Sequence, residues 1–159
     1  MAVEAGGLRI RYTVTSTSKD TIYLSDQMPV PGKTSFVLGK DFINVAGGDS
    51  PGTVRFVRGR LTSIAPVPIP LDPGARALKP GQTLTGEALI PLPIQPAHYH
   101  GLAAPLNGTP TQAILEIGYV GADAHWTDLA LEDGGKLTIT MPMDKMAFLR
   151  TAPKPIPTS

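Results

Sequence analysis

The chain has 159 residues, enough for one domain with a hydrophobic core, and its net charge of +1 is close to neutral. No block of lysine or arginine supplies the positive footprint of a nucleic-acid-binding protein, and no apolar run reaches the ~20 residues of a membrane-spanning helix. The absence of cysteine excludes disulfides, thiol catalysis and cysteine-based metal sites.

The N-terminal residues 1–7 contain neither a basic region nor an apolar run, so the sequence as written has no signal peptide. This predicts a cytoplasmic protein. A periplasmic or secreted protein whose N-terminus has been trimmed would look the same. The lack of cysteine does not separate these compartments, because a cysteine-free chain is stable in either redox environment.

The first predicted elements are short strands. Apolar and polar residues alternate over residues 8–15, which indicates a half-buried strand. Residues 21–25 follow a polar turn and are predicted to return as the second strand of a hairpin. Two short apolar runs lie within residues 34–45. Residues 53–62 form the next predicted strand, in which a change of phase near residues 57–59 predicts a β-bulge.

The middle of the chain is built around proline, which neither donates to a strand ladder nor fits inside a helix. A first run covers residues 66–70. A Pro–Gly pair at positions 80–81 precedes an alternating strand over residues 83–90, and Pro91 and Pro93 end that strand. This segment is therefore predicted to be the crossover between two sheets.

The last third of the chain adds a central strand and a hairpin. Residues 113–120 are nearly all apolar, as expected of a strand covered on both faces. Residues 129–131 and 136–141 flank an acidic Gly–Gly turn at 132–135, which predicts a second hairpin. The proline-rich tail, residues 151–159, is predicted to be extended and loosely held.

Together these elements predict a single all-β domain over residues 1–150. About eight short strands with glycine and proline turns, and no convincing helix, are typical of an immunoglobulin-like β-sandwich with long Pro/Gly-rich loops. Glycine and proline number 17 each, without a fixed period, which fits a fold with many turns. A small β-barrel is the alternative.

Five segments of the chain resemble a group of small uncharacterised bacterial β-proteins. They are residues 8–16, 67–71, 78–86, 90–94 and 96–100. In that group an immunoglobulin-like first strand precedes a proline-rich middle and an aromatic or histidine-rich corner. The resemblance implies a bacterial origin and a β-sandwich, and it implies no catalytic residues.

The clearest candidate for chemistry is a pair of histidines, His98 and His100, on either side of a tyrosine. On a strand, residues i and i+2 share a face, so two imidazoles could hold one zinc or copper ion. A third ligand would have to come from Asp123, His125 or Asp128. The alternative is a pair of solvent-facing loop histidines beside a tyrosine that anchors the corner.

Five arginines on predicted strands are a second candidate, a basic stripe for an anion or an acidic partner. They are Arg9, Arg11, Arg55, Arg58 and Arg60. The near-zero net charge favours instead a solvated strand face on which Glu87 and Glu116 balance the arginines.

No catalytic pattern emerges from the sequence. No serine lies in a Gly-x-Ser-x-Gly turn, and no glycine-rich loop precedes a helix that could bind phosphate. The sequence therefore predicts a non-enzymatic protein without a cofactor, which mediates protein–protein interaction or assembly through edge strands and loops. Its partner is another protein or a second copy. The alternative is a zinc- or copper-binding module that uses His98 and His100.

Overall fold

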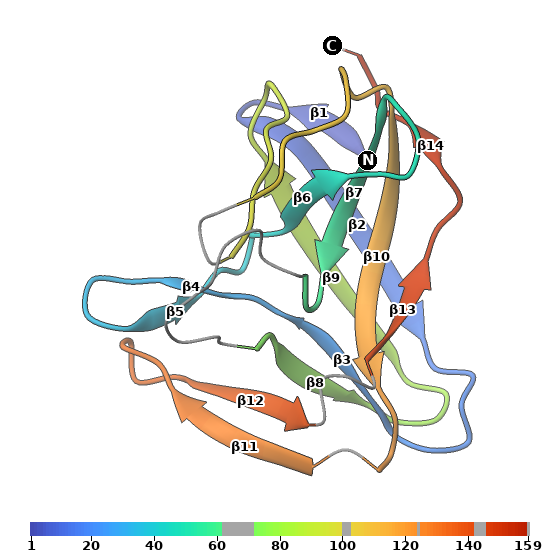
Figure 1. The fold of residues 1–159 in the computed structure, drawn as a ribbon. Helices are drawn as coiled ribbons and strands as arrows, with labels where there is room; N and C mark the ends of the chain where they lie inside the picture. Colours follow the sequence, from blue (N-terminus) through green and yellow to red (C-terminus); the bar gives the residue numbers. More distant parts are fainter. Residues whose placement is uncertain (62–71, 100–102, 124, 142–145, 159) are drawn as a thin grey trace.

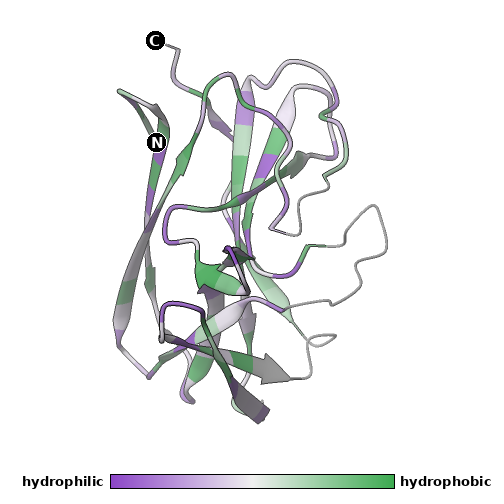
Figure 2. Ribbon diagram, turned by 90° about the vertical axis from the view of Figure 1, so that its left-hand side faces the viewer, coloured by the Kyte–Doolittle hydropathy of each residue, from purple (hydrophilic) through white to green (hydrophobic). Residues whose placement is uncertain are grey.

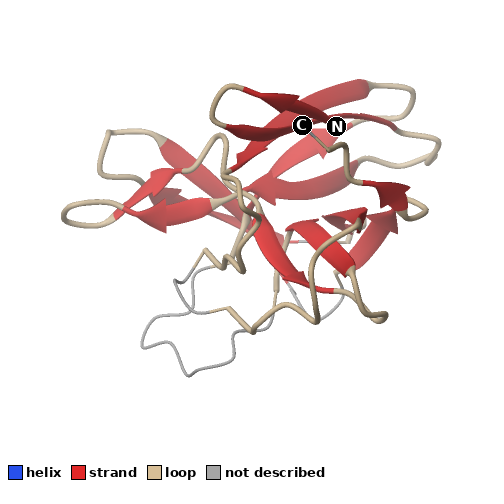
Figure 3. Cartoon of the chain, turned by 90° about the horizontal axis from the view of Figure 1, so that it is seen from above, coloured by secondary structure: helices blue, strands red, loops and turns tan. Residues whose placement is uncertain are grey.

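The computed structural model describes residues 1–61, 72–99, 103–123, 125–141 and 146–158. Fourteen strands and no helix lie in this part of the chain (Figures 1 and 3), so no described helix has the length and apolar character needed to cross a membrane. The predicted all-β fold is confirmed, and its sheets stay open, as in a sandwich, rather than closing into a barrel. The strands outnumber the predicted eight because several have only two to four residues.

The small sheet has three antiparallel strands: β1 (Ala2–Glu4), β2 (Gly7–Thr15) and β9 (Thr83–Ile90), in the order β1-β2-β9. The strands β2 and β9 pair residue for residue over eight positions. Tyr12 lies opposite Gly86, where a Cβ atom would approach its ring to 2.2 Å. Glycine at position 86 therefore lets the tyrosine ring lie across β9.

The large sheet has nine strands. They are β3 (Ile22–Gln27), β6 (Asn44–Gly47), β7 (Thr53–Arg58), β8 (Gly74–Leu78), β10 (Gln112–Val120), β11 (His125–Ala130), β12 (Lys136–Met141), β13 (Ala147–Arg150) and β14 (Lys154–Pro155). Seven of them follow the order β11-β12-β8-β3-β10-β7-β6, and β13 and β14 also pair with β10.

Strand β10 is the centre of the large sheet, because both of its edges are used twice. Gln112 and Ala113 pair with β7 and also with β14, so these two strands lie on opposite edges. Tyr119 pairs with β3 and also with β13. One edge of β10 thus carries β7 and β3, and the other carries β14 and β13 (Figure 1). The predicted central strand is confirmed.

The two sheets enclose the core. Hydrophobic and hydrophilic residues alternate along the longer strands (Figure 2), and the apolar side chains meet between the sheets. The first cluster joins residues such as Leu8, Ile10 and Ile90 of the small sheet to Val54 and Phe56 of the large one. A second cluster, centred on Tyr12, Leu24, Leu78 and Ile117, continues the core toward the other end.

A third sheet has two strands, β4 (Pro29–Pro31) and β5 (Phe36–Leu38). It packs against the β11–β12 hairpin. The turns of the two hairpins are joined by Glu132. Its carboxylate accepts the backbone N–H groups of Lys33, Thr34 and Ser35 at 3.1, 2.9 and 3.0 Å. These donors lower the pKa of Glu132 to about 2.

Three sequence predictions need correction. The strands β2 and β3 do not form a hairpin, because β2 pairs with β1 and β9 whereas β3 pairs with β8 and β10. The β-bulge predicted near residues 57–59 is absent, because β7 pairs in unbroken register to Arg58. The apolar residues do not alternate regularly there because both faces of β7 are covered. The tail is not loose, since β14 pairs with β10 and the Thr151 and Ile156 N–H groups bond to Leu115 and Thr111.

Acid should separate the two hairpins. Because the pKa of Glu132 is lowered on folding, its stabilisation is present above the ordinary value of 4.5 and is lost as pH falls toward about 2. We expect Glu132→Gln to lower the urea midpoint at pH 6 and to have little effect near pH 2. If Glu132→Gln lowered the urea midpoint equally at pH 6 and near pH 2, the result would contradict this role of the carboxylate.

Candidate functional site

The histidine corner lies beside β6, where Val45 and Ala97 form an isolated antiparallel bridge. His98 is 5% exposed, and its ring stacks on Tyr99 with centroids 4.6 Å apart. Its Nε2 lies 2.9 Å from the carbonyl oxygen of Leu61. Since a carbonyl oxygen only accepts, Nε2 is the donor in this bond. His98 is therefore not the solvent-facing histidine of the alternative interpretation.

Tyr99 anchors this corner to the end of β7. Its backbone N–H donates to Asn44 Oδ1 at 2.9 Å, and the same Asn44 side chain donates to the carbonyl of Val57 at 3.1 Å. The Tyr99 side chain is buried, which raises the pKa of its hydroxyl to about 12. The tyrosine thus has a structural role in the corner.

The structure does not gather a metal-ligand set around His98. His100 lies outside the described residues. Of the candidate third ligands, Asp123 lies in the turn before β11, and His125 and Asp128 lie on β11 itself. Within the described ranges no group of three His, Cys, Asp or Glu side chains could hold a metal ion. Zinc or copper binding by His98 and His100 stays a prediction.

The five arginines do not form one stripe. Arg9 and Arg11 lie on the small sheet, where both contact Glu4 at 3.1–3.2 Å. Arg55, on the large sheet, binds the fully buried Glu116 through two nitrogens, at 3.1 and 2.7 Å. The predicted solvated face is therefore wrong for Glu116, which lies inside the protein between strands.

Arg58 is a buried cation that joins the two sheets. It is 5% exposed, and its guanidinium donates to the carbonyls of Asp26 at 3.2 Å and of Lys40 at 2.7 Å. A third bond goes to the carbonyl of Glu87 on β9. The guanidinium carbon lies 5.8 Å from the centre of the Tyr12 ring. One side chain thus connects β7, β3, the loop after β5 and the small sheet.

Asp26 completes the connection between the sheets. Its carboxylate is 1% exposed and accepts from Arg76 Nε at 3.0 Å and from the Tyr12 hydroxyl at 3.0 Å. Burial, together with the charge of Asp26, raises the pKa of Tyr12. The hydrogen bond to Asp26 raises the pKa of Arg76.

These contacts close the β9 edge of the small sheet. Three backbone groups of β9 that face away from β2 have partners in the large sheet or in the loop after β5. The bonds run from Arg76 to the Thr85 carbonyl, from Arg58 to the Glu87 carbonyl and from the Leu89 N–H to the Asp41 carbonyl. An edge strand without such partners is a template for pairing with another chain. Strand β9 is not available in this way.

The opposite edge of the small sheet is open. Strand β1 pairs only with residues 7–9 of β2, and no other strand in the described part of the chain pairs with residues 10–15 on that side. Ser16 directs its backbone N–H and carbonyl toward the β9 side, where they bond to Gln82 and Gly81 at 2.9 and 3.1 Å. These two bonds determine the side to which the backbone N–H and carbonyl groups of each preceding residue of β2 point.

Successive residues of a strand direct their N–H and carbonyl groups to opposite sides. Because those of Ser16 point toward β9, the backbone groups of Thr15, Thr13 and Arg11 point toward the open edge. The closed edge supports the same alternation, since Thr85, which faces Thr13, has its carbonyl turned away from β2 toward Arg76. Three residues of β2 thus offer their backbone groups to a ligand.

A hollow of about 270 Å³ lies beside this edge, and we name it the lateral slot. Its walls come from three strands and the residue after β13. They are Tyr12, Thr13, Val14, Thr15, Leu115, Ile117, Leu149, Arg150 and Thr151. Across the slot, β13 is exposed at every residue, and Leu149 retains 37% of its surface. The slot thus combines an open strand edge with an apolar floor.

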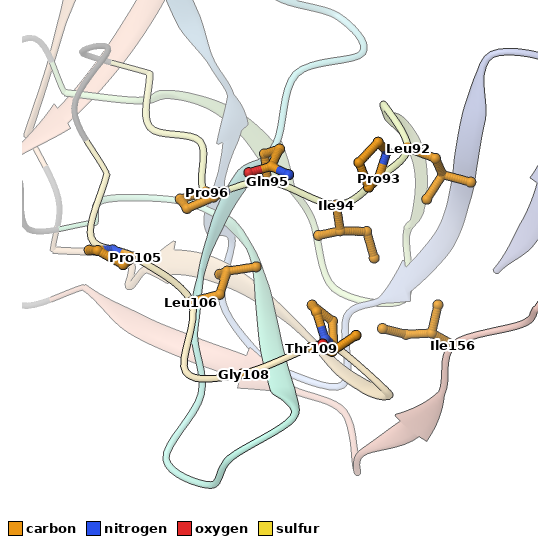
Figure 4. A pocket seen from close by; sticks show the side chains of 11 residues that line it. Leu92, Pro93, Ile94, Gln95, Pro96, Pro105, Leu106, Gly108, Thr109 and Ile156 are labelled. Atoms are coloured by element: carbon orange, nitrogen blue, oxygen red, sulfur yellow. The ribbon is translucent and has the colours of Figure 1, made fainter.

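Another cavity, of about 690 Å³, lies where the segment after β9 meets residues 105–110. Ile94, Leu106 and Ile156 face a common space there (Figure 4). None of the residues that line it is charged, and much of its wall is proline. None of the described residues that line this cavity has a titratable side chain, and the C-terminal tail forms part of its wall through Ile156.

Comparison of the chain with protein-family models, with curated proteins and with solved structures found no match. The suspected bacterial group therefore stays a prediction, and the function is inferred from the geometry alone.

The lateral slot was not visible from the sequence. The alternation over residues 8–15 places Tyr12 and Val14 on the inner face of a strand, as the structure confirms. An open edge, however, depends on which distant strands pair, and no local pattern reports this. The one sequence signal for the slot is Leu149, an apolar residue that lies just before the proline-rich tail in a segment with no clear alternation.

Arg58 should be far more important for stability than its neighbour Arg60. We expect Arg58→Met to lower the free energy of unfolding by about 2–4 kcal/mol, because it leaves three carbonyls without their donor. Arg60→Met is the matched control, since the Arg60 side chain is 51% exposed, and it should change stability by less than about 1 kcal/mol. Equal losses in urea denaturation would exclude the proposed connection between the sheets.

His98→Ala should destabilise the protein whether or not metal is present. The substitution removes the donor to the Leu61 carbonyl, which costs about 1–3 kcal/mol. Urea denaturation with Zn²⁺, with Cu²⁺ and with a chelator checks this. A metal-dependent gain in stability that disappears in His98→Ala and in His100→Ala would instead favour the metal-binding module.

Proposed function

We propose that this chain is a non-enzymatic protein-binding module that accepts an extended segment of another polypeptide along the open edge of β2. The observation that carries the proposal is the contrast between the two edges of the small sheet. One edge is closed by Arg58, Arg76 and a backbone bond, and the other is left open above an apolar hollow.

The chemistry of such binding follows from the slot. Backbone groups of Arg11, Thr13 and Thr15 supply hydrogen bonds to an added strand, and such bonds give affinity without regard to sequence. Side chains of the added strand that point inward would lie over Val14, Leu115 and Leu149. The preferred ligand therefore carries apolar residues at every second position.

The size of the slot supports a strand rather than a small molecule. Its volume of about 270 Å³ is below the ~300–1,000 Å³ typical of small-molecule pockets. The hollow also follows four consecutive residues of β2, from Tyr12 to Thr15. An elongated, shallow space suits a few side chains of a bound strand.

The proposal is tested by selecting heptapeptides from a random phage-displayed library on the immobilised protein. We expect selected peptides with alternating apolar residues that bind Thr13→Pro about tenfold more weakly than the wild type. Proline removes the N–H that faces the open edge but no bond to β9. Thr13→Val keeps the N–H and should bind like the wild type.

A second pair of variants separates the two faces of β13. Leu149 and Phe148 are equally exposed, at 37%, but only Leu149 lines the slot. Leu149→Asp should abolish peptide binding, and Phe148→Asp should preserve it. Selected peptides that bind Thr13→Pro as tightly as Thr13→Val, or a strict monomer that selects none, would overturn the proposal.

A further inference from the structure

The most exposed aromatic side chain lies on β11, a strand that does not line the lateral slot. Trp126 is 60% exposed and is the single tryptophan of the sequence. The remaining residues of this edge strand are also exposed or half-buried. A tryptophan in this position carries a large apolar surface that the fold itself does not use.

The indole lies against the ring of Tyr23 on β3. The two ring centroids lie 5.6 Å apart, and the ring planes make an angle of 34°. This offset, tilted contact covers part of the indole and leaves its remaining surface in solvent. The two rings thus form one aromatic surface.

A carboxylate lies on the same face of the strand. Asp128 is two residues beyond Trp126, and residues i and i+2 share a face. Thr138 Oγ1 donates to Asp128 Oδ1 at 2.9 Å, which orients the carboxylate. The neighbouring strand places Thr138, and not Lys136, opposite Asp128, because Lys136 pairs with Ala130. Among the described residues no cation forms an ion pair with Asp128.

We propose that Tyr23, Trp126 and Asp128 form a binding site for an alkylated ammonium group, which is independent of the lateral slot. The electron-rich faces of the rings attract a cation, and Asp128 supplies the opposite charge beside them. Methyl groups on the nitrogen lie against the rings and reduce the cost of removing the cation from water. A choline head group and a trimethylated lysine share this chemistry.

The single tryptophan makes the site directly observable. We expect choline to shift the Trp126 indole N–H signal in a saturable NMR titration. Its neutral isostere, 3,3-dimethylbutan-1-ol, should bind at least tenfold more weakly, because it has the same shape without the charge. Methyl glucoside should produce no saturable shift.

Two variants separate the roles of charge and ring. Asp128→Asn should reduce choline affinity toward that of the isostere, with the rings retaining part of the preference for the cation, and Tyr23→Leu should reduce it several-fold. Thr138→Val keeps the charge but frees the carboxylate, so a smaller loss is expected. Equal binding of choline and the isostere, a stronger response to the glucoside, or unchanged affinity in Asp128→Asn would overturn the site.

The source of the ammonium group is decided by comparing phosphocholine micelles with a trimethyl-lysine peptide. The phosphate of the lipid head group would lie near Asp128, so the geometry favours the peptide. Tighter binding of either probe supports the site and identifies the source, and no binding of either overturns it.

Discussion

The contact between the two sheets of this protein is centred on one buried cation, Arg58. Arg58 leaves β7 and reaches carbonyl oxygens on β3, on the loop after β5 and on β9. A buried charge is costly unless it is hydrogen-bonded, so the three carbonyls that accept from the terminal nitrogens of Arg58 stabilise it, although its Nε has no partner among the described residues. The closed edge of the small sheet follows from this constraint. The open edge of β2 has no such bond to Arg58 or to Arg76.

Glu116 has a comparable role within the large sheet. It is fully buried on β10 and is bound by Arg55 of β7 and by Arg150 of β13, the latter at 2.7 Å. The hydrogen bonds to this carboxylate raise the pKa of Arg55. One carboxylate thus joins the neighbours on both edges of β10. Glu116, Arg55 and Arg58, which the sequence assigned to a solvated face, are instead internal connections of the fold. Arg11, Arg60 and Glu87 of the same predicted face are more than half exposed.

Local patterns predicted strands well and their pairing poorly. The alternation in β2 and β9 and the apolar run of β10 are properties of neighbouring residues, so they are readable in the sequence. The partners of β10 come from distant segments and are not. His98 was a candidate by residue type, but the residues around it have no periodicity from which its burial could be predicted. Trp126 was missed because a strand exposed on both faces has no alternation to detect.

Strand β10 also sets the order in which the protein can fold. Two of its partners, β3 and β7, are synthesised before it, and two, β13 and β14, are synthesised after it. During translation, β10 can therefore pair on only one of its edges until β13 and β14 have been synthesised. Pairing across such long sequence separations is slow, and an uncovered central strand attracts other chains. We expect the interval before β13 and β14 attach to be the period of greatest aggregation risk.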